Sequence, residues 1–317
     1  MPDIRVAVIG AGGWGRQHAR AFAQHPEAEL VGIWSRDLGK AERRAAEWHT
    51  TGYDDVDRMI DAERPDLISV CLPNTEHFVL TERLLKRRIP LLVEKPLVFD
   101  LDEAHTLIAE AADTFFAINF NHRYAVPVQR AAEAIRSGRL GVLDFLTWRF
   151  GGEGSSAHHP YANLIETQCH GIDLLEHLGG PIEAVSAELH GSTVAATLRF
   201  ASGAVGSLVG SYDSSYAYPG THHLEVNGHA GRVLVEDTVK RYTFSAAGNE
   251  TREVWEAGYF DDLGRSFEQT FDRHLDALLA ALAAGDEPPV PATAGLRALE
   301  VCAAIIEASG SGRRTQV

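Results

Sequence analysis

Apolar runs and segments of helical composition alternate along the first 120 residues. The apolar runs are rich in β-branched residues and lie at residues 4–9, 29–35, 65–73, 89–93 and 115–120. Strands that alternate with helices in this way are typical of a mostly parallel sheet with helices on both faces. The pattern therefore predicts an α/β fold with a doubly wound parallel sheet for the first part of the chain.

The pattern changes near residue 122. From Leu143 onward strand-like segments dominate, and Ala201-Ser202-Gly203 between two of them is a hairpin signal. We therefore divide the chain into a first domain of residues 1–121 and a second domain of residues 122–317. The last helix, at about residues 294–309, is expected to pack back on the first domain.

Length and charge narrow the classes of protein. The chain has 317 residues, enough for two separate cores, and its formal net charge is −15. Such an acidic chain is not expected to bind nucleic acids or anionic membranes. No apolar run approaches the roughly 18 residues that span a bilayer. We expect no secretion signal, because the printed sequence does not open with a basic segment followed by an apolar one. The three cysteines form no C-x-x-C pair, so reduced thiols and a cytoplasmic location are expected.

Three glycines follow the first apolar run, and a helix-forming segment follows them. Their spacing is Gly10-x-Gly12-x-x-Gly15, which in this context is the fingerprint of a dinucleotide-binding site. Gly10 allows the tight turn, Gly12 lets a pyrophosphate approach the backbone, and Gly15 brings helix and strand close together. The alternative is an ordinary glycine-rich turn. We expect the cofactor to contact Gly10, Gly12, Gly13, Trp14 and Gly15.

The end of the second apolar run bears on the choice between NAD and NADP. An NAD site usually has Asp or Glu about 20 residues after the glycines to bind the ribose 2′-hydroxyl. Ser35 and Arg36 stand there instead, and a hydroxyl with a guanidinium would bind a 2′-phosphate. Lys40 is a further candidate cation. We therefore predict NADP as the preferred cofactor, with NAD as the alternative if Asp37 binds the ribose.

Two later strand ends also carry polar residues. Asn74 follows the third apolar run, where it can either cap the next helix or contact the cofactor. Glu94-Lys95-Pro96 follows the fourth run, and ligands of open α/β sheets bind beyond such strand ends. Lys95 is thus a candidate for proton transfer, although this tripeptide is also common on surfaces. The bond before Pro96 is a candidate cis peptide.

The segment 164–178 predicts a helix with a polar face beside its apolar stripe. Glu166, His170 and Asp173 lie at positions i, i+4 and i+7 on that face. We expect Glu166 or Asp173 to orient the imidazole of His170, which would then carry a proton for an alcohol and carbonyl pair. The alternative is a solvated face joined by pairs of this spacing.

The loop before this helix, at residues 151–161, is rich in glycine and polar residues. Loops on a rigid scaffold commonly carry recognition, so His158, His159 and Tyr161 are candidates for a substrate pocket. A metal site at the two histidines is the sharper alternative. Adjacent histidines point apart, however, and no third ligand stands at a useful spacing. We therefore predict no metal site.

These motifs occur in one order along the whole chain. The glycine turn, Pro73–His77, Glu94–Pro96 and Asn121–Tyr124 are followed by Glu166-x-x-x-His170-x-x-Asp173 and the final helix. In this order the chain resembles the glucose-fructose oxidoreductase, inositol dehydrogenase and rhizopine-catabolism (Gfo/Idh/MocA) family. Each motif alone is weak, but their ordered combination is specific.

The resemblance implies a Rossmann domain followed by an α+β domain with a large, mostly antiparallel, open-faced sheet. It also implies a nicotinamide cofactor, a sugar or cyclitol substrate, and a homodimer or homotetramer formed through the open face. In such enzymes a lysine, an acidic residue and a histidine surround the reacting carbon, which here are Lys95, Glu166 and His170. Further cofactor contacts are expected at Leu72, Pro73, Asn74, His77, Glu94, Lys95, Pro96 and Arg123. Substrate contacts are expected at Lys95, Asn121, Arg123, Tyr124, His158, Tyr161, Glu166 and His170.

Two residues depart from the family's usual pattern. Glu166 stands where Asp is more common, and Gln168 replaces a glycine, so we expect a reshaped pocket. The leading hypothesis is an oxidoreductase that moves a hydride between nicotinamide and a hydroxyl-bearing carbon of a sugar or cyclitol. A redox-cycling glycosidase and a non-catalytic nucleotide or sugar sensor are the alternatives.

Overall fold

The computed structural model describes residues 4–154, 159–256, 258 and 266–317. The chain forms two compact units: residues 1–120 with 271–296, and residues 121–270 with 297–317. It therefore passes between the units three times, whereas the sequence led to a single division between residues 121 and 122.

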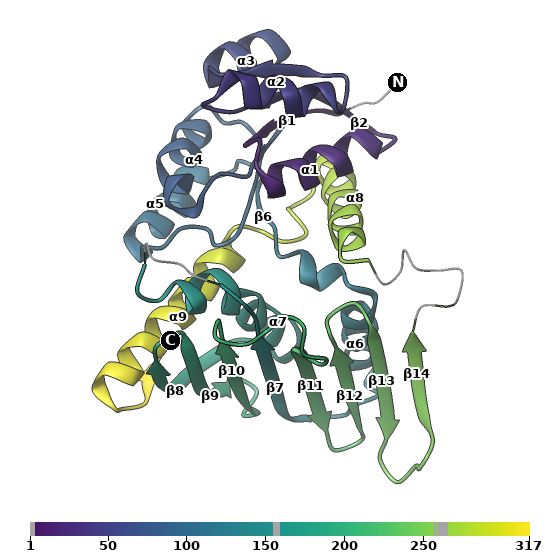
Figure 1. The fold of residues 1–317 in the computed structure, drawn as a ribbon. Coiled ribbons are helices and arrows are strands. Elements are labelled where there is room, and N and C mark those ends of the chain that lie inside the picture. The colour runs from purple at the N-terminus through teal and green to yellow at the C-terminus, as the bar shows by residue number, and fades with distance from the viewer. Residues whose placement is uncertain (1–3, 155–158, 257, 259–265) are drawn as a thin grey trace. The chain divides into compact units, whose positions relative to one another are not determined.

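Unit 1 is built on a six-stranded sheet in the order β3-β2-β1-β4-β5-β6 (Figure 1). All of its pairings are parallel, and the strand order reverses between β1 and β4, as in dinucleotide-binding folds. The predicted doubly wound α/β fold is thereby confirmed. The strands are β1 (Ile4–Ile9), β2 (Ala28–Trp34), β3 (Thr51–Tyr53), β4 (Leu67–Val70), β5 (Leu91–Val93) and β6 (Phe116–Ile118), and the helices between them are α1 (Gly13–Gln24), α2 (Leu38–Ala46), α3 (Val56–Glu63), η1 (Asn74–Glu76), α4 (His77–Lys86) and α5 (Leu101–Ala111).

The central strands of this sheet are buried along nearly their whole length. Every residue of β1 except Arg5 is buried, and β4 and β5 are buried at every position. Parallel sheets covered on both faces need such continuous apolar strands. This is why apolar runs, and not alternating patterns, predicted these elements.

Helix α8 (Glu268–Ala284) adds to the core of unit 1 from far along the chain. Leu275 and Leu278 belong to the same apolar cluster as residues of β1 and α1. Arg20 Nη2 on α1 lies 2.6 Å from Asp272 Oδ1 on α8. Residues after 270 therefore complete the first unit, which the sequence pattern did not indicate.

Unit 2 contains a nine-stranded sheet in the order β14-β13-β12-β11-β7-β10-β9-β8-β15. Its strands pair antiparallel except for β7 with β10. Buried and exposed residues alternate along β9, as expected where one face is covered and the other open. The expected α+β domain with a mostly antiparallel sheet is confirmed. Its strands are β7 (Leu143–Gly151), β8 (Ile182–His190), β9 (Thr193–Phe200), β10 (Val205–Ser211), β11 (His222–Gly228), β12 (Gly231–Glu236), β13 (Arg241–Ala246), β14 (Arg252–Glu256) and β15 (Thr315–Gln316).

Helices cover one face of this sheet. Helix α6 (Val126–Arg136) lies against β12 and β13, and α7 (Cys169–Gly179) lies against β7 (Figure 1). A short 3-10 helix, η2 (Asn121–Tyr124), precedes α6, and a π-helix, η3 (Asn163–Gln168), leads directly into α7.

The last helix, α9 (Thr293–Ser311), begins in unit 1 and continues in unit 2. In unit 2, Arg297 Nε lies 3.0 Å from Glu176 Oε1, and Ser309 Oγ accepts a hydrogen bond from the Leu189 N–H. Most of α9 therefore packs within the second unit, whereas the sequence had led us to expect that it would pack back on the first.

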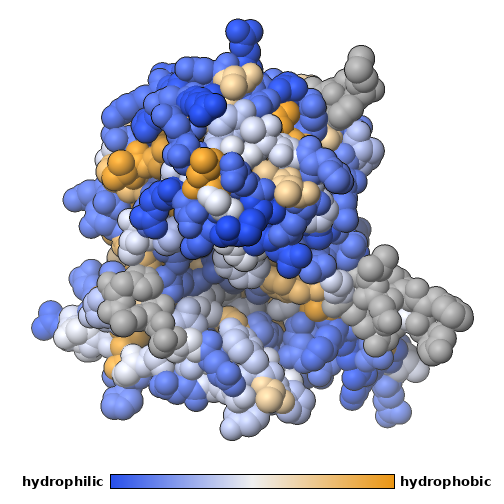
Figure 2. All heavy atoms as spheres, turned by 45° about the horizontal axis from the view of Figure 1, so that its top comes forward, coloured by the Kyte–Doolittle hydropathy of each residue, from blue (hydrophilic) through white to orange (hydrophobic). Residues whose placement is uncertain are grey.

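Hydrophilic side chains dominate the face shown in Figure 2, in line with the acidic composition. None of the described helices is long and apolar enough to cross a bilayer. All three cysteines are buried free thiols: Cys71, Cys169 and Cys302.

Candidate active site

Three loops of unit 1 meet at one edge of its sheet. β1 leads into the glycine turn, β4 into residues 71–76, and β5 into Glu94 and Lys95. Because β1, β4 and β5 are neighbours and parallel, their carboxyl ends lie side by side. Ligands of open α/β sheets bind at this edge, where the strand order reverses. The edge is therefore the candidate cofactor site.

The glycines of the turn have different tasks. Gly10 has φ +120°, and a Cβ there would lie 2.2 Å from the carbonyl oxygen of Cys71. A Cβ on Gly15 would lie 1.8 Å from the carbonyl oxygen of Gly10. Packing of the turn thus requires both glycines. A Cβ on Gly12 or Gly13, in contrast, would meet no atom within 4 Å.

This open space lies at the start of α1. Gly12 is the N-cap of the helix, its first turn contains no acidic residue, and no side chain caps it. Amides at a helix N-terminus bind anions readily, so the turn fits a pyrophosphate. Trp14 is 50 % exposed and stacks on Phe271, with ring centroids 5.8 Å apart, which leaves a large aromatic surface accessible beside the turn.

We expect Gly12→Ala to weaken dinucleotide binding about tenfold or more, because the added methyl group occupies the space that a pyrophosphate needs. The melting temperature should change little, since the methyl group meets no protein atom. Gly15→Ala is the matched control and should destabilise the fold. Fluorescence titration with NADH and NADPH, together with thermal unfolding, measures both effects. Unchanged affinity in Gly12→Ala would show that the turn is not the binding site.

The end of β2 carries the residues expected to select the cofactor. The carboxylate of Asp37 accepts a hydrogen bond from the Lys40 N–H at 3.1 Å and so caps α2. Arg36 is exposed, and its Nη2 lies 3.1 Å from Glu76 Oε1. Exposed ion pairs contribute at most about 1 kcal/mol, so Arg36 is available to a competing anion.

His77 was expected to contact the cofactor, but its imidazole is fully buried. Nδ1 lies 2.9 Å from the carbonyl oxygen of Pro96, and Nε2 lies 3.1 Å from that of Leu72. The side chain therefore joins the loops that follow β4 and β5. Among the other expected contacts, Pro73 and Asn74 begin the 3-10 helix η1 at the same edge.

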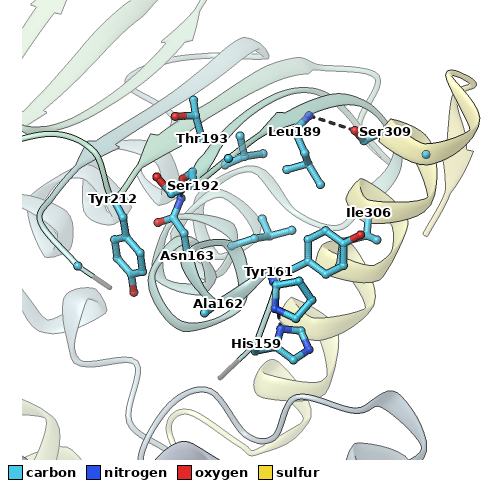
Figure 3. Close-up of a pocket in the computed structure, with 16 residues that line it drawn as sticks. His159, Tyr161, Ala162, Asn163, Leu189, Ser192, Thr193, Tyr212, Ile306 and Ser309 are labelled. Atoms are coloured by element: carbon cyan, nitrogen blue, oxygen red, sulfur yellow. Dashed lines mark hydrogen bonds between the residues drawn. The ribbon is translucent and has the colours of Figure 1, made fainter. Parts of the chain in front are cut away.

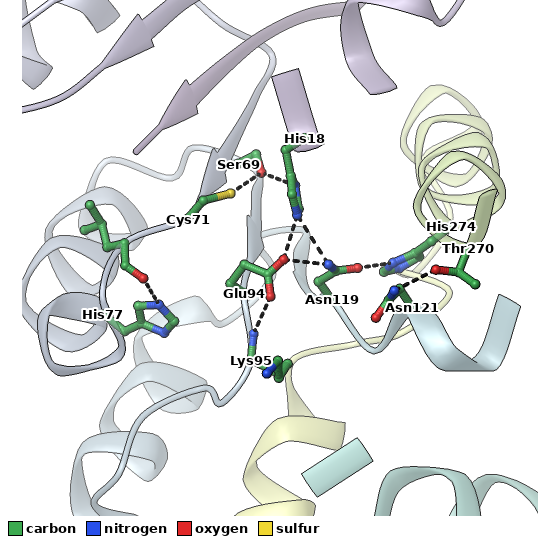
Figure 4. Close-up of polar contacts among 11 residues, drawn as sticks. His18, Ser69, Cys71, His77, Glu94, Lys95, Asn119, Asn121, Thr270 and His274 are labelled. Carbon is green, nitrogen blue, oxygen red and sulfur yellow. Dashed lines mark hydrogen bonds and ion pairs between the residues drawn. The ribbon is translucent and has the colours of Figure 1, made fainter. Parts of the chain in front are cut away.

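Glu94 was also expected to contact the cofactor, but it belongs to a buried network (Figure 4). Its Oε1 lies 2.8 Å from His18 Nε2 and accepts a hydrogen bond of 2.7 Å from the Asn119 amide. His18 Nδ1 lies 2.8 Å from Ser69 Oγ, and Asn119 Oδ1 lies 2.8 Å from His274 Nδ1. The network thus joins α1, β4, the residues that directly follow β5 and β6, and α8.

The pKa shifts within this network indicate a charged pair. Burial alone would lower the pKa of His18, but Cys71 and Glu94 raise it to about 10. Burial would raise the pKa of Glu94, but His18, Lys95 and Asn119 lower it overall. At neutral pH an imidazolium therefore donates to a carboxylate in the core of unit 1.

Lys95 follows this carboxylate directly. Its backbone N–H donates a hydrogen bond of 3.2 Å to Glu94 Oε2, and the Lys95–Pro96 peptide is cis, the isomer that the sequence proposed. The loop that carries Lys95 is thus fastened to the His18–Glu94 pair. Within Glu94-Lys95-Pro96, Lys95 therefore stays the candidate for proton transfer.

In unit 2 the predicted helix occurs as η3 followed by α7. Glu166 lies on the π-helical turn and His170 in the first turn of α7, with 8 % and 7 % exposure. π-Helical turns are frequent at functional sites. The imidazole of His170 stacks on that of His122, with ring centroids 3.9 Å apart and planes at 5°.

Asp173 does not orient His170 as the spacing had indicated. Its Oδ2 accepts a hydrogen bond of 2.9 Å from Arg123 Nε, and Oδ1 accepts a second one from Arg123 Nη2. This bidentate pair holds η2 against α7. It also occupies Arg123, which was expected to contact cofactor and substrate.

Two other expected site residues, Asn121 and Tyr124, and the unusual Gln168 are buried or partly buried within unit 2. Asn121 donates a hydrogen bond of 2.7 Å to Thr270 Oγ1, and burial raises the pKa of Tyr124 to about 12. Gln168 was expected to reshape the pocket, but it is fully buried, and its Oε1 accepts a hydrogen bond of 3.1 Å from Trp148 Nε1. A Cβ on Gly210 would lie 2.1 Å from Gln168, so this glycine makes the room that the amide occupies.

The loop before η3 borders a cavity of about 790 Å³ within unit 2 (Figure 3). His159 and Tyr161 line it, as do residues of η3, the β8–β9 turn and α9. His158 lies outside the described residues. Within the described part of the chain, no group of three His, Cys, Asp or Glu side chains has the geometry of a metal site.

Sequence reasoning missed several polar residues. His18, Asn119 and His274 of the buried network drew no attention because they lie on different elements. His122 and His222 were missed as well, although both contribute to the aromatic cluster around His170. Only the position of His18 could have indicated the network from the sequence, because this polar residue lies on the apolar side of the helix that follows the glycine turn.

The fold and this edge define a dinucleotide-binding oxidoreductase domain joined to a second α+β domain. The chain belongs to the Gfo/Idh/MocA family, as its motifs had predicted. Residues 4–119 match the model of the oxidoreductase family with an NAD-binding Rossmann fold, and residues 134–317 match the model of its C-terminal alpha/beta domain. Unit 1 therefore carries a nicotinamide cofactor site.

Individual relatives are more distant. Inositol 2-dehydrogenase 4 of Saccharopolyspora erythraea is 26 % identical over 330 residues, which cover 99 % of this chain and 96 % of that protein. D-glucoside 3-dehydrogenase of Escherichia coli is 31 % identical over 150 residues, but this match covers only 46 % of this chain and 43 % of the relative. The structure of levoglucosan dehydrogenase with NADH has a TM-score of 0.89 at 18 % identity, with 99 % of both chains covered, and it shows the shared fold.

Proposed function

We propose that the protein is an NAD(P)-dependent dehydrogenase that acts on a CH–OH group of a sugar, sugar derivative or cyclitol. The observation that carries this proposal is the open space over Gly12 and Gly13 at the same sheet edge as Lys95. The dehydrogenase names of relatives that cover nearly the whole chain support the substrate class. The relatives favour neither the redox-cycling glycosidase nor the sensor.

In this proposal the cofactor, when bound, supplies or accepts the hydride. The glycine turn and the N-terminus of α1 hold its pyrophosphate. Lys95 hydrogen-bonds the reacting oxygen and moves its proton, His170 is the second proton carrier, and Glu166 positions the substrate. The His18–Glu94 pair fixes the loop that carries Lys95. Assembly into a homodimer or homotetramer through the open face of the nine-stranded sheet is part of the same proposal.

NADP is the proposed preference because Ser35 and Arg36 stand where NAD sites usually have a carboxylate. We expect Arg36→Ala to lower kcat/KM for NADP about tenfold or more, since a charge-assisted hydrogen bond contributes about 1.5–3 kcal/mol. The value for NAD should change little. Steady-state kinetics with both cofactors measures these values. The same measurement on Lys40→Ala compares Arg36 with the other candidate cation. Equal losses with both cofactors would assign Arg36 no role in the selection.

The experiment that tests the function is a substrate panel. Hexoses, their glycosides and the inositols are each incubated with NAD and with NADP, and absorbance at the nicotinamide band is followed. Turnover of at least one polyol is expected, and it should depend on Lys95. Tight cofactor binding without turnover of any compound would contradict the proposal and favour a sensor.

A further inference from the structure

The cavity of about 790 Å³ in unit 2 has no role in the proposed proton transfer. Its wall is formed by the start of η3, the β8–β9 turn, Tyr212 after β10 and the last turns of α9 (Figure 3). The volume lies in the upper part of the range of about 300–1,000 Å³ that is typical of small-molecule sites. It offers more room than one sugar ring requires.

The cavity lies beside the helical segment that carries the candidate carboxylate. Asn163 and Leu164 line it, and Glu166 follows on the same π-helix. Tyr212 lines the cavity too, and its hydroxyl accepts a hydrogen bond from Thr167. Burial raises the pKa of Tyr212 to about 12, and the charge of Glu166 contributes to this shift. Glu166 does not itself line the cavity, but Tyr212 lies between the cavity and the part of the helix that carries this carboxylate.

The lining indicates the chemistry of the occupant. Among the described residues that line the cavity, none is Lys, Arg, Asp or Glu. A phosphate would find neither of the guanidinium and ammonium groups that usually bind it, with His159 as the one titratable imidazole among the described lining residues. Tyr161 offers an aromatic surface, while Ser192 and Thr193 offer hydroxyl groups. Apolar faces combined with a few placed polar groups suit a neutral ring that carries hydroxyls.

Asn163 supplies a second, independent observation. Its side chain is more than nine-tenths buried, and its Nδ2 donates a hydrogen bond to the carbonyl oxygen of Ser192. Its Oδ1 is buried and has no hydrogen-bond partner among the described residues. A buried acceptor left without a donor has lost its hydrogen bond to water and gained none in return, which destabilises the protein. A ligand hydroxyl that donates to Oδ1 would remove this cost.

We infer that this cavity is a subsite for a second, neutral sugar ring, so that the substrate is a disaccharide or similar O-glycoside. The inference rests on the proposed function, since it requires oxidation at a carbon held near Glu166. The oxidised ring lies near Glu166, and the linked ring occupies the space beside Asn163.

The test compares each hexose or inositol of the panel with its derivative that carries a second hexose and with its UDP derivative. We expect kcat/KM for the disaccharide to exceed that for the free ring at least tenfold, with no such gain for the UDP derivative. Ile306→Trp fills the cavity from α9 and should abolish most of this preference. Glu307→Trp, exposed on the same helix and outside the lining, should retain it.

The outcomes separate the two proposals. Turnover of free rings with no preference for disaccharides would overturn the subsite and leave the dehydrogenase intact. A preference that Ile306→Trp leaves unchanged would also overturn it. No turnover of any compound would contradict the proposed function itself. If Ile306→Trp does not fold, the preference of the wild-type protein and its calorimetric affinity for the disaccharide decide.

Discussion

Lys95→Met is expected to lower kcat by about 10²–10⁴-fold, the usual contribution of a general acid or base. The substitution keeps the length of the side chain but removes the group that moves the proton. His170→Asn should cause a loss of the same order. The losses are measured at saturating cofactor on the substrate that the panel identifies. Lys86→Met, a change of the same kind at the exposed end of α4, should leave kcat unchanged.

The double variant makes this prediction sharper. Residues that act as one unit in catalysis show strongly non-additive losses. The Lys95→Met/His170→Asn protein should therefore be little slower than the slower single variant. If the fold-losses in kcat of the two single variants multiply in the double variant, the residues act independently. Full activity in either single variant would remove that residue from the mechanism.

His18→Ala is expected to lower the free energy of unfolding by about 3–5 kcal/mol, because it leaves the buried Glu94 carboxylate without its cationic partner. Chemical denaturation at pH 7 measures the loss. Lys86→Ala breaks an exposed pair with Glu82 and should change stability little. If His18→Ala lowers the free energy of unfolding no more than Lys86→Ala does, the buried pair is not charged.

The same pair predicts how stability depends on pH. The pKa of His18 is raised to about 10, so its stabilisation is complete below about pH 6.5 and is lost as pH rises toward 10. The pKa of Glu94 is lowered, so its contribution is lost only in acid. Denaturation midpoints from pH 6 to 10 should fall in the wild-type protein and remain flatter in His18→Ala.

The sequence predicted the fold well because the signals for it are local. Continuous apolar runs marked the buried parallel strands, and Gly10, Gly12 and Gly15 marked the turn between β1 and α1. The apolar run before Lys95 and the helical pattern of residues 164–178 predicted a strand end and a helix, and the structure has Lys95 after β5 and Glu166 and His170 on η3 and α7. What these residues do together remains a proposal.

The side-chain pairings were harder to predict because they join distant residues. Nothing near Asp173 shows that Arg123, fifty positions earlier, takes its carboxylate instead of His170. Glu94 looked like a ligand contact because its partner His18 lies on another element. Gln168 was expected in the pocket because the sequence does not show that Gly210, on β10, leaves room for its side chain in the core.

The return of the chain to unit 1 was hidden for a similar reason. The amphipathic pattern of α8 predicts a helix but does not name the surface that its apolar side covers. Only the packing shows that Leu275 and Leu278 join the core of β1 and α1.

The most direct measurement of the central claim follows the transferred hydrogen. The sugar identified by the panel, with deuterium on its CH–OH carbons, is incubated with oxidised cofactor and the products are examined by NMR. The account predicts that one deuterium appears at C4 of the nicotinamide and that Lys95→Met slows this appearance by the same factor as kcat. Loss of that deuterium to water, with none at C4 of the nicotinamide, would contradict it.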